Sequence, residues 1–256
     1  MDTGAALPTA LLLDGGSPHM IGLGTLINTA LVVVGGIAGL LFGRFITPRL
    51  QDGLMKATAL SVLFVGLSGA LGGMLSIDGG KLVSGGTAMV VVSLAGGALI
   101  GEWINLEHQI SRFGEWLKYK TGSGGDSTFV NGFVTASLTV SIGAMAIVGS
   151  IQDGINADPS TLILKGAIDA LLVCVMTASM GKGCIFSAIP VLLFEGSVTL
   201  LARLVQPIMT AAAIANISTV GAILIFCVGV NLIWERTFKV ANLLPAVAIA
   251  VLFALF

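Results

Sequence analysis

The sequence has little charge for its length, and what charge it has is balanced. Only 10% of the 256 residues are Asp, Glu, Lys or Arg, whereas soluble domains contain roughly 25%. The formal net charge is −1, and no basic tail is present. A nucleic-acid-binding protein would show a basic patch or stripe. We therefore expect no nucleic-acid partner.

Side chains that ligate metals or attack substrates are also scarce. Cys174, Cys184 and Cys227 lie in apolar segments without CxxC spacing, which indicates packing rather than a metal site or a disulfide. His19 and His108 are too far apart for an HExxH zinc motif. The sequence contains no GxSxG motif, and its Gly-rich segment near residue 124 lacks the GK[ST] of a phosphate loop. We expect no metal, no cofactor and no enzymatic activity.

Apolar residues take the place of the missing charge. They make up 55% of the chain and give a mean hydropathy of +1.02. A soluble protein this apolar would expose large adhesive patches, so we expect the lipid bilayer to be its solvent. The 35 glycines lie mostly inside apolar runs, where small residues allow membrane helices to approach closely.

Several segments are long and apolar enough to cross a bilayer, which takes about 20 residues. The eight candidates are 21–43, 57–77, 82–104, 129–151, 160–181, 184–205, 214–234 and 240–256. A Gly-Lys-Gly hairpin at 181–183 separates the fifth from the sixth. The sequence therefore predicts an all-α polytopic transmembrane helix bundle that forms a single domain over residues 1–256.

Lysine and arginine are unevenly distributed between the two ends of these spans. With the N-terminus outside, three of them stay on the outer side or at span edges, namely Lys81, Lys165 and Arg203. The other nine fall on the inner side: Arg44, Arg49, Lys56, Arg112, Lys118, Lys120, Lys182, Arg236 and Lys239. Because basic residues favour the cytoplasmic side, we expect both termini outside.

Two polar segments lie outside the predicted spans, residues 1–20 and the connector 105–127. Residues 1–20 lack the basic n-region of a cleaved signal peptide, so we expect an external tail or a short interfacial segment. The connector 105–127 begins with an apolar stripe at Ile110, Phe113, Trp116 and Leu117. That spacing predicts an amphipathic helix at the membrane surface, followed by a flexible link.

Two parts of the chain resemble each other. Residues 24–46 and 183–205 both start at Gly and approach an Arg and a Pro at the same spacing, and 59–71 and 222–234 share a central Val-Gly. We predict a first repeat over 21–104 and a second over 183–256, separated by the connector and a central helix pair over 128–181. Five crossings separate the halves, so they insert in opposite directions, as in many secondary transporters. Alternatively, any two helices rich in Leu, Val and Gly look alike.

Ionisable side chains inside spans are costly to bury and mark functional sites by default. Lys165 and Asp169 share one helix face at i,i+4 and can pair. They form either a structural salt bridge or a proton or cation site that gates a conformational change. Glu195 follows Pro190, which leaves a carbonyl without its helical partner. Desolvation disfavours a charged carboxylate, so Glu195 is a candidate proton carrier, or else a carboxylate satisfied by neighbouring helices.

The densest polar segment is 143–160. We expect residues 149–154, including Gln152 and Asp153, to interrupt the fourth span and to line a wet cavity. A turn between two helices is the other interpretation. Asn28 hydrogen-bonds between helices or contacts the solute, and Arg203 lies where it can meet an anion or a carboxylate.

The segments GTLINTALVVVGGIAGLLFG, GAMAIVGSIQDGINAD, LKGAIDALL and ANLLPA together resemble the bacterial YdfK/YqgA-like inner-membrane proteins, a domain-of-unknown-function family (DUF554). The resemblance runs from about residue 21 to the C-terminus. It implies a prokaryotic multi-pass protein of the inner (cytoplasmic) membrane. It also places Gln152, Asp153, Lys165, Asp169 and Asn242 on the polar motif positions of the family, and it carries no activity with it.

We expect a small secondary transporter or channel for a small solute or ion, proton- or cation-coupled. The alternative is a non-transporting membrane protein, an assembly or sensory partner that docks through residues 105–120. The predicted substrate or ion site consists of Asp153, Gln152, Asp169, Lys165, Glu195 and Asn28. The Gly-rich run GGIAGLLFG would permit a homodimer.

Overall fold

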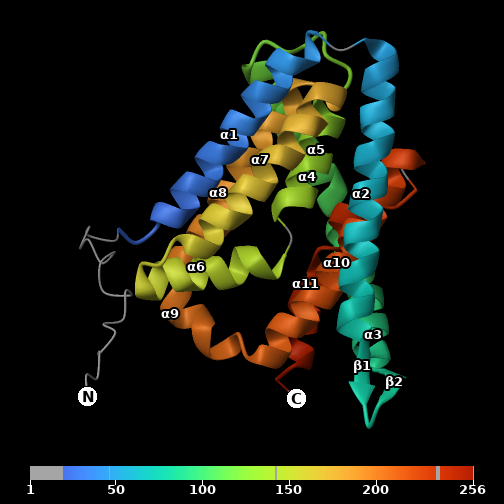
Figure 1. Cartoon of the computed structure of the whole chain (residues 1–256), viewed down its shortest axis with the longest axis vertical. Helices are drawn as coiled ribbons and strands as arrows, with labels where there is room; N and C mark the ends of the chain where they lie inside the picture. The colour runs from blue at the N-terminus through green and yellow to red at the C-terminus, as the bar shows by residue number, and fades with distance from the viewer. Residues whose placement is uncertain (1–19, 46, 142, 235–236, 256) are drawn as a thin grey trace, which may run out of the picture.

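The computed structural model describes residues 20–45, 47–141, 143–234 and 237–255. Nearly all of this chain is helical, so the predicted all-α polytopic bundle is confirmed. The expected N-terminal tail lies outside the described residues, apart from Met20. α1 begins at the left of the molecule, about half-way up, and α11 ends toward its lower end (Figure 1).

The elements follow one another with short connections. The helices and strands are α1 (Leu23–Gly43), α2 (Pro48–Met74), β1 (Leu75–Asp78), β2 (Lys81–Ser84), α3 (Thr87–Ile104), α4 (Leu106–Lys120), α5 (Phe129–Ser141), α6 (Ala144–Asn156), α7 (Ser160–Met180), α8 (Ala188–Leu200), α9 (Ala202–Val205), α10 (Ala211–Ile233) and α11 (Pro245–Phe253). The two strands form an antiparallel hairpin with Leu75 opposite Ser84. Short 3-10 turns precede α8, follow α9 and precede α11.

Six helices in the described residues are long and apolar enough to cross a membrane, and the bent pair α5/α6 would make a seventh. The last predicted span, 240–256, corresponds to a shorter apolar helix over Val240–Phe253. The predicted total of eight is therefore not confirmed. Large apolar side chains such as Leu99, Leu171 and Leu200 are more than 70% exposed. Such surfaces suit lipid, and the chain is a membrane protein.

The fourth span is broken, but not where the sequence analysis placed the break. α5 ends at Ser141 and α6 starts at Ala144, with the two axes inclined at 63°. Gly143 between them is extended. Gly149 and Gly154, expected to interrupt the span, lie inside α6. They allow close packing against Leu162 and Thr199, respectively, so they serve helix contact rather than helix termination.

The closest helix contacts are made by glycines. α1 and α7 run parallel, with Gly35 against Ala170 and Gly39 against Cys174. The GGIAGLLFG run therefore packs within the chain, and the homodimer stays a prediction. α2 and α10 run antiparallel, with Gly66 against Phe226 and Gly229 against Leu63.

The contact between α2 and α10 is reciprocal. Gly66 meets Phe226, which precedes Gly229 by three residues, and Gly229 meets Leu63, which precedes Gly66 by three residues. Gly66 and Gly229 are the glycines of the shared Val-Gly. A contact in which each helix offers the same surface to the other is the signature of a two-fold relation.

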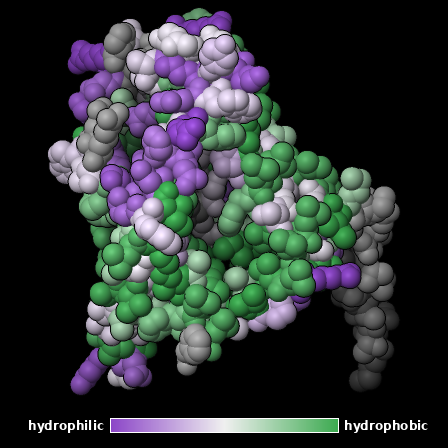
Figure 2. All heavy atoms as spheres, turned by 180° about the vertical axis from the view of Figure 1, so that it is seen from behind, coloured by the Kyte–Doolittle hydropathy of each residue, from purple (hydrophilic) through white to green (hydrophobic). Residues whose placement is uncertain are grey.

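The amphipathic helix predicted over 105–120 is α4. Its apolar face packs on α5: Gly114 contacts Phe133, the ring centroids of Phe113 and Phe133 lie 5.8 Å apart, and Leu117 is buried. Figure 2 shows hydrophilic side chains gathered toward the upper end of the molecule and apolar side chains over much of the remainder of that face. The α1–α2 connection lies at this same upper end (Figure 1).

Gly66→Ala is expected to destabilise the protein by about 1–3 kcal/mol, the cost of overpacking a tight contact. The added Cβ would overlap the backbone of α10 at Phe226. Gly72→Ala is the matched control in the same helix, because nothing lies within 4 Å of its added Cβ. It should stabilise by about 0.5–1 kcal/mol through backbone entropy. Denaturant unfolding in detergent measures both, and equal effects would contradict this packing.

Candidate functional site

A cluster of buried polar side chains lies where α1, α5, α6, α7 and α8 meet. Its centre is Lys165 on α7, whose side chain is 8% exposed. The Lys165 ammonium pairs with Asp169 one turn later on the same helix and lies 3.3 Å from Glu195 Oε1 on α8. The Glu195 side chain is fully buried. Three ionisable groups from two helices thus meet in the interior.

The third partner of Lys165 is a backbone carbonyl. Its Nζ donates a hydrogen bond of 2.7 Å to the carbonyl oxygen of Val140. Val140 is the second-last residue of α5, so the helix break deprives its carbonyl of the usual backbone donor. A helix C-terminus also carries partial negative charge and favours a cation. The break in the fourth span therefore creates an acceptor that Lys165 satisfies.

α1 contributes neutral polar groups to the same cluster. Asn28 Nδ2 donates a hydrogen bond of 2.7 Å to Glu195 Oε1. One turn earlier, the hydroxyls of Thr25 and Thr199 lie 3.1 Å apart. These two contacts run in opposite directions along α1 and α8, so the helices are antiparallel. Both layers are buried, with Asn28 and Glu195 at 0% exposure.

Asp153 on α6 is buried beside the first turn of α1. Its Oδ2 accepts a hydrogen bond of 3.2 Å from the backbone nitrogen of Thr25, and the missing side chain of Gly24 leaves room for the carboxylate. Asp153 therefore joins the Thr25–Thr199 layer and not the Lys165 group directly. The two layers are one helical turn apart, about 5.4 Å.

Several buried atoms of the cluster have no hydrogen-bond partner. They are three acceptors: Asn28 Oδ1, Asp153 Oδ1 and Glu195 Oε2. Buried polar atoms are normally satisfied, and exceptions call for water, an ion or a functional role. The unpartnered acceptors here can receive a proton, a water or a cation.

The charges of the cluster do not balance. The interior of these five helices holds three carboxyl groups, Asp153, Asp169 and Glu195, and one ammonium, Lys165, within the described part of the chain. An uncompensated buried charge is very costly. At least one carboxyl must therefore be protonated or must bind a further cation. Among the residues described, no group of three or more His, Cys, Asp or Glu is placed to hold a metal ion.

One predicted site residue, Gln152, lies outside the cluster. It is half-buried on α6, and its Oε1 accepts a hydrogen bond of 2.7 Å from the Thr161 hydroxyl, which ties α6 to the start of α7. Arg203, expected to meet an anion or a carboxylate, is exposed on α9. The predicted residues Asn28, Lys165, Asp169 and Glu195 come together, and Asp153 lies one layer away beside Thr25.

The Thr25 and Thr199 hydroxyls and the Val140 carbonyl lie outside the site predicted from the sequence. Thr25 lies three residues before Asn28, and Thr199 lies four residues after Glu195, so each shares a helix face with a predicted site residue. That periodicity could have identified them. The Val140 carbonyl could not have been found, because its availability depends on where the helix breaks.

Asn242, a polar motif position in the resemblance, holds helix ends together. Its Oδ1 accepts a hydrogen bond of 2.7 Å from the backbone nitrogen of Glu107 at the start of α4. Glu107 Oε2 in turn accepts from the backbone nitrogen of Ala241. The interaction connects α4 to the turn before α11, so Asn242 is structural.

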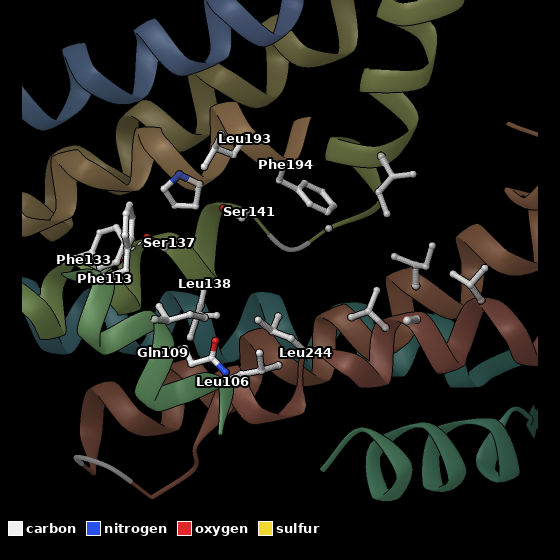
Figure 3. Close-up of a pocket in the computed structure, with 18 of the residues that line it drawn as sticks. Leu106, Gln109, Phe113, Phe133, Ser137, Leu138, Ser141, Leu193, Phe194 and Leu244 are labelled. Carbon is white, nitrogen blue, oxygen red and sulfur yellow. Dashed lines mark hydrogen bonds between the residues drawn. The ribbon is translucent and has the colours of Figure 1, made fainter. Parts of the chain in front are cut away.

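A cavity of about 700 Å³ lies on the other side of α5 and α8, within the size range of ligand pockets. Figure 3 shows Leu193 and Phe194 of α8 and Ser137 and Ser141 of α5 around it. Most of the lining is apolar, with contributions from α4, α10 and α11. Ser141 is the residue after Val140, so the helix break borders both the cavity and the charged cluster.

Comparison with known proteins agrees with the membrane character of the fold. The family described as "Protein of unknown function (DUF554)" matches residues 23–255. The uncharacterized membrane protein YdfK of Bacillus subtilis is 28% identical over 226 residues, which covers 88% of this chain and 93% of YdfK. The uncharacterized protein YqgA of Escherichia coli is 26% identical, with 89% and 94% covered. No solved structure matches at a significant level.

Lys165→Met is expected to lower the free energy of unfolding by about 3–5 kcal/mol, as when one partner of a buried ion pair is removed. The substitution leaves Asp169, Glu195 and the Val140 carbonyl without their cation. Lys56→Met is the control, because Lys56 pairs with Asp52 at the same i,i+4 spacing but both side chains are more than 60% exposed. Its effect should stay below about 1 kcal/mol. Similar losses in thermal unfolding would contradict a buried network.

Proposed function

The chain belongs to the DUF554 family, and from this premise we propose that it is a secondary transporter or channel for a small solute or ion, coupled to protons or cations. The observation that carries the proposal is the buried group of Lys165, Asp169 and Glu195 beside a broken helix. Intramembrane ionisable groups are expensive and are retained where ions or protons pass. Broken helices at membrane depth are tolerated where they line a site.

An inverted-repeat architecture is part of the proposal. The reciprocal contact of Gly66 and Gly229 across antiparallel α2 and α10 supports it. The antiparallel contact of α1 and α8 supports it as well, and Val32 and Val191, matched positions of the two repeats, belong to the same fully buried core. In such transporters the ion site lies between the repeats near the middle of the membrane. The cluster lies on the α1–α8 contact, which joins the two halves.

The orientation follows from the basic residues. The upper end of the molecule carries the α1–α2 connection with Arg44 and Arg49 (Figure 1) and the turn with Lys182. By the preference of basic residues for the cytoplasmic side, this end faces the cytoplasm of an inner membrane. The beginning of α1 and the end of α11, which both lie away from this end (Figure 1), then face outward.

The geometry provides a way to couple ion binding to a change of shape. The Lys165 ammonium holds the Val140 carbonyl, Asp169 and Glu195 together. A proton or cation that neutralises a carboxylate weakens this hold and frees the carbonyl at the α5–α6 break. Because Ser141 borders the apolar cavity, the released segment can change the cavity. We propose that the cluster carries ions and does not catalyse a reaction.

The alternative role, an assembly or sensory partner, has less support. It requires a docking surface on residues 105–120, and the apolar face of that helix is already covered by α5 through Gly114 and Leu117. α4 leaves exposed the aromatic rings of Phe113, Trp116 and Tyr119, at 38%, 52% and 82%, together with polar side chains.

Asp169→Asn is expected to abolish flux in proteoliposomes while the protein still inserts and elutes as a single species from detergent. The amide keeps the size of the carboxylate but cannot take up a proton or balance Lys165. Asp52→Asn is the control, since Asp52 pairs with Lys56 at the same spacing on the surface, and its flux should match that of the unmodified chain. Flux is measured with a panel of ions and metabolites, with and without a proton gradient. Absence of flux in the unmodified chain for every solute would overturn the proposal.

A further inference from the structure

A continuous line of polar groups runs along the α1–α8 contact from one end of the bundle to the charged cluster. The outermost group is Asp153, which lies beside Gly24 and Thr25 in the first turn of α1. The chain reaches the surface shortly after it, at the exposed residues Asn156 and Asp158. Asp153 itself is at 0% exposure and its Oδ1 has no partner.

The line continues inward through two layers. The Thr25 and Thr199 hydroxyls form the first, 3.1 Å apart. Asn28 and Glu195 form the second, and Glu195 Oε2 has no partner there. Lys165 and Asp169 then complete the cluster. The threonine layer and the Asn28–Glu195 layer are one helical turn apart on both α1 and α8.

The next layer of the α1–α8 contact is apolar and consists of Val32 and Val191, and Val173 and Met176 of α7 lie with them in one core. All four side chains are at 0% exposure. The buried Ser187 hydroxyl, four residues before Val191, lies on the far side of this layer. This apolar layer separates the cluster from the end of the molecule that carries Arg44 and Lys182. The cluster therefore has polar access from one end and an apolar seal toward the other.

We propose that protons reach the Lys165 cluster only from the end where α6 joins α7, and that Asp153 is the first group to bind them. The proposal rests on the proposed transport function and specifies its coupling ion and its side of entry. A hydronium ion gives its proton to Asp153 and leaves as water. The proton then passes to Glu195 through the threonine layer and water, and Asp153 returns to a carboxylate.

The packing favours a proton over a metal ion. The Thr25 and Thr199 hydroxyls are in direct contact, and Asn28 binds Glu195 at 2.7 Å. A metal ion would have to separate α1 from α8, whereas a proton moves between oxygens that already touch or share a water. The unpartnered oxygens of Asp153 and Glu195 supply acceptors at both ends of the route.

The titratable groups that face this route are few. α6 supplies Asp153, α7 supplies Lys165 and Asp169, and α8 supplies Glu195, whereas the described segments of α1 and α5 contain no ionisable side chain. The thiols of Cys174 and Cys184 lie toward the sealed end. A proton on Glu195 removes one of the two carboxylate charges that hold Lys165.

Thiol accessibility tests the one-sided route without any assumption about flux. Thr199→Cys places a thiol in the polar line, and Thr177→Cys places one on α7 beyond the seal. The two positions are equally buried at 3% and 2% exposure. In the full chain in vesicles transferred to D2O, the S–H stretching band in the infrared should convert to S–D faster in Thr199→Cys than in Thr177→Cys, because a deuteron needs no more room than the proposed proton route provides. The unmodified chain with its three cysteines gives the background.

Equal exchange at the two positions, or faster exchange in Thr177→Cys, would overturn the route. If flux is present while Thr199→Cys exchanges no faster than Thr177→Cys, the route is wrong and the transport proposal stands. If Thr199→Cys exchanges faster but no solute moves, the access is real and the transport proposal fails.

Proton uptake provides a second test that needs no cysteine variant. Asp153→Asn should slow uptake, followed with a pH-sensitive dye inside the vesicles, by roughly a hundredfold, the scale of losing one positioned proton-transfer group. Asp158→Asn removes an exposed carboxylate at the same end and should leave the rate unchanged. If proton uptake slows equally in both variants, the cause is the loss of surface charge, and the proposed role of Asp153 is overturned. A rate driven by a sodium gradient and unaffected by pH would also overturn it.

Discussion

The ammonium of Lys165 in the interior of the bundle is the interaction on which the remaining arrangement depends. It compensates Asp169 and Glu195 and satisfies the Val140 carbonyl at once. Without the helix break there would be no free carbonyl, and without the ammonium the break would leave an acceptor unsatisfied in lipid. The broken span therefore supplies an acceptor for the buried ammonium, and the ammonium satisfies the carbonyl that the break leaves free.

Composition and spacing were enough to predict a membrane protein, its all-α helix bundle and the pairing of Lys165 with Asp169. The i,i+4 spacing of Lys165 and Asp169 identified the pair because neighbours on a helix face need no tertiary information. Glu195 was predicted as costly to bury and Asn28 as a contact between helices or with the solute, but their convergence beside Lys165 depends on how α1 and α8 pack. A single sequence does not contain that packing.

The misplaced break has a specific physical cause. Glycine serves two purposes in membrane helices, because it lowers helix stability and also lets backbones approach. Gly149 and Gly154 serve the second purpose, against Leu162 and Thr199. Gly143 is extended at the joint. The two uses of glycine cannot be told apart until the neighbouring helix is known.

The crossing of α2 and α10 has a mechanical consequence. Gly66 lies against the backbone of Phe226, and Gly229 lies against the backbone and side chain of Leu63. The backbones are in contact at this crossing, so the distance between the two helices is fixed there. The crossing can serve as a fulcrum, so that a small tilt at the crossing becomes a larger displacement at the helix ends.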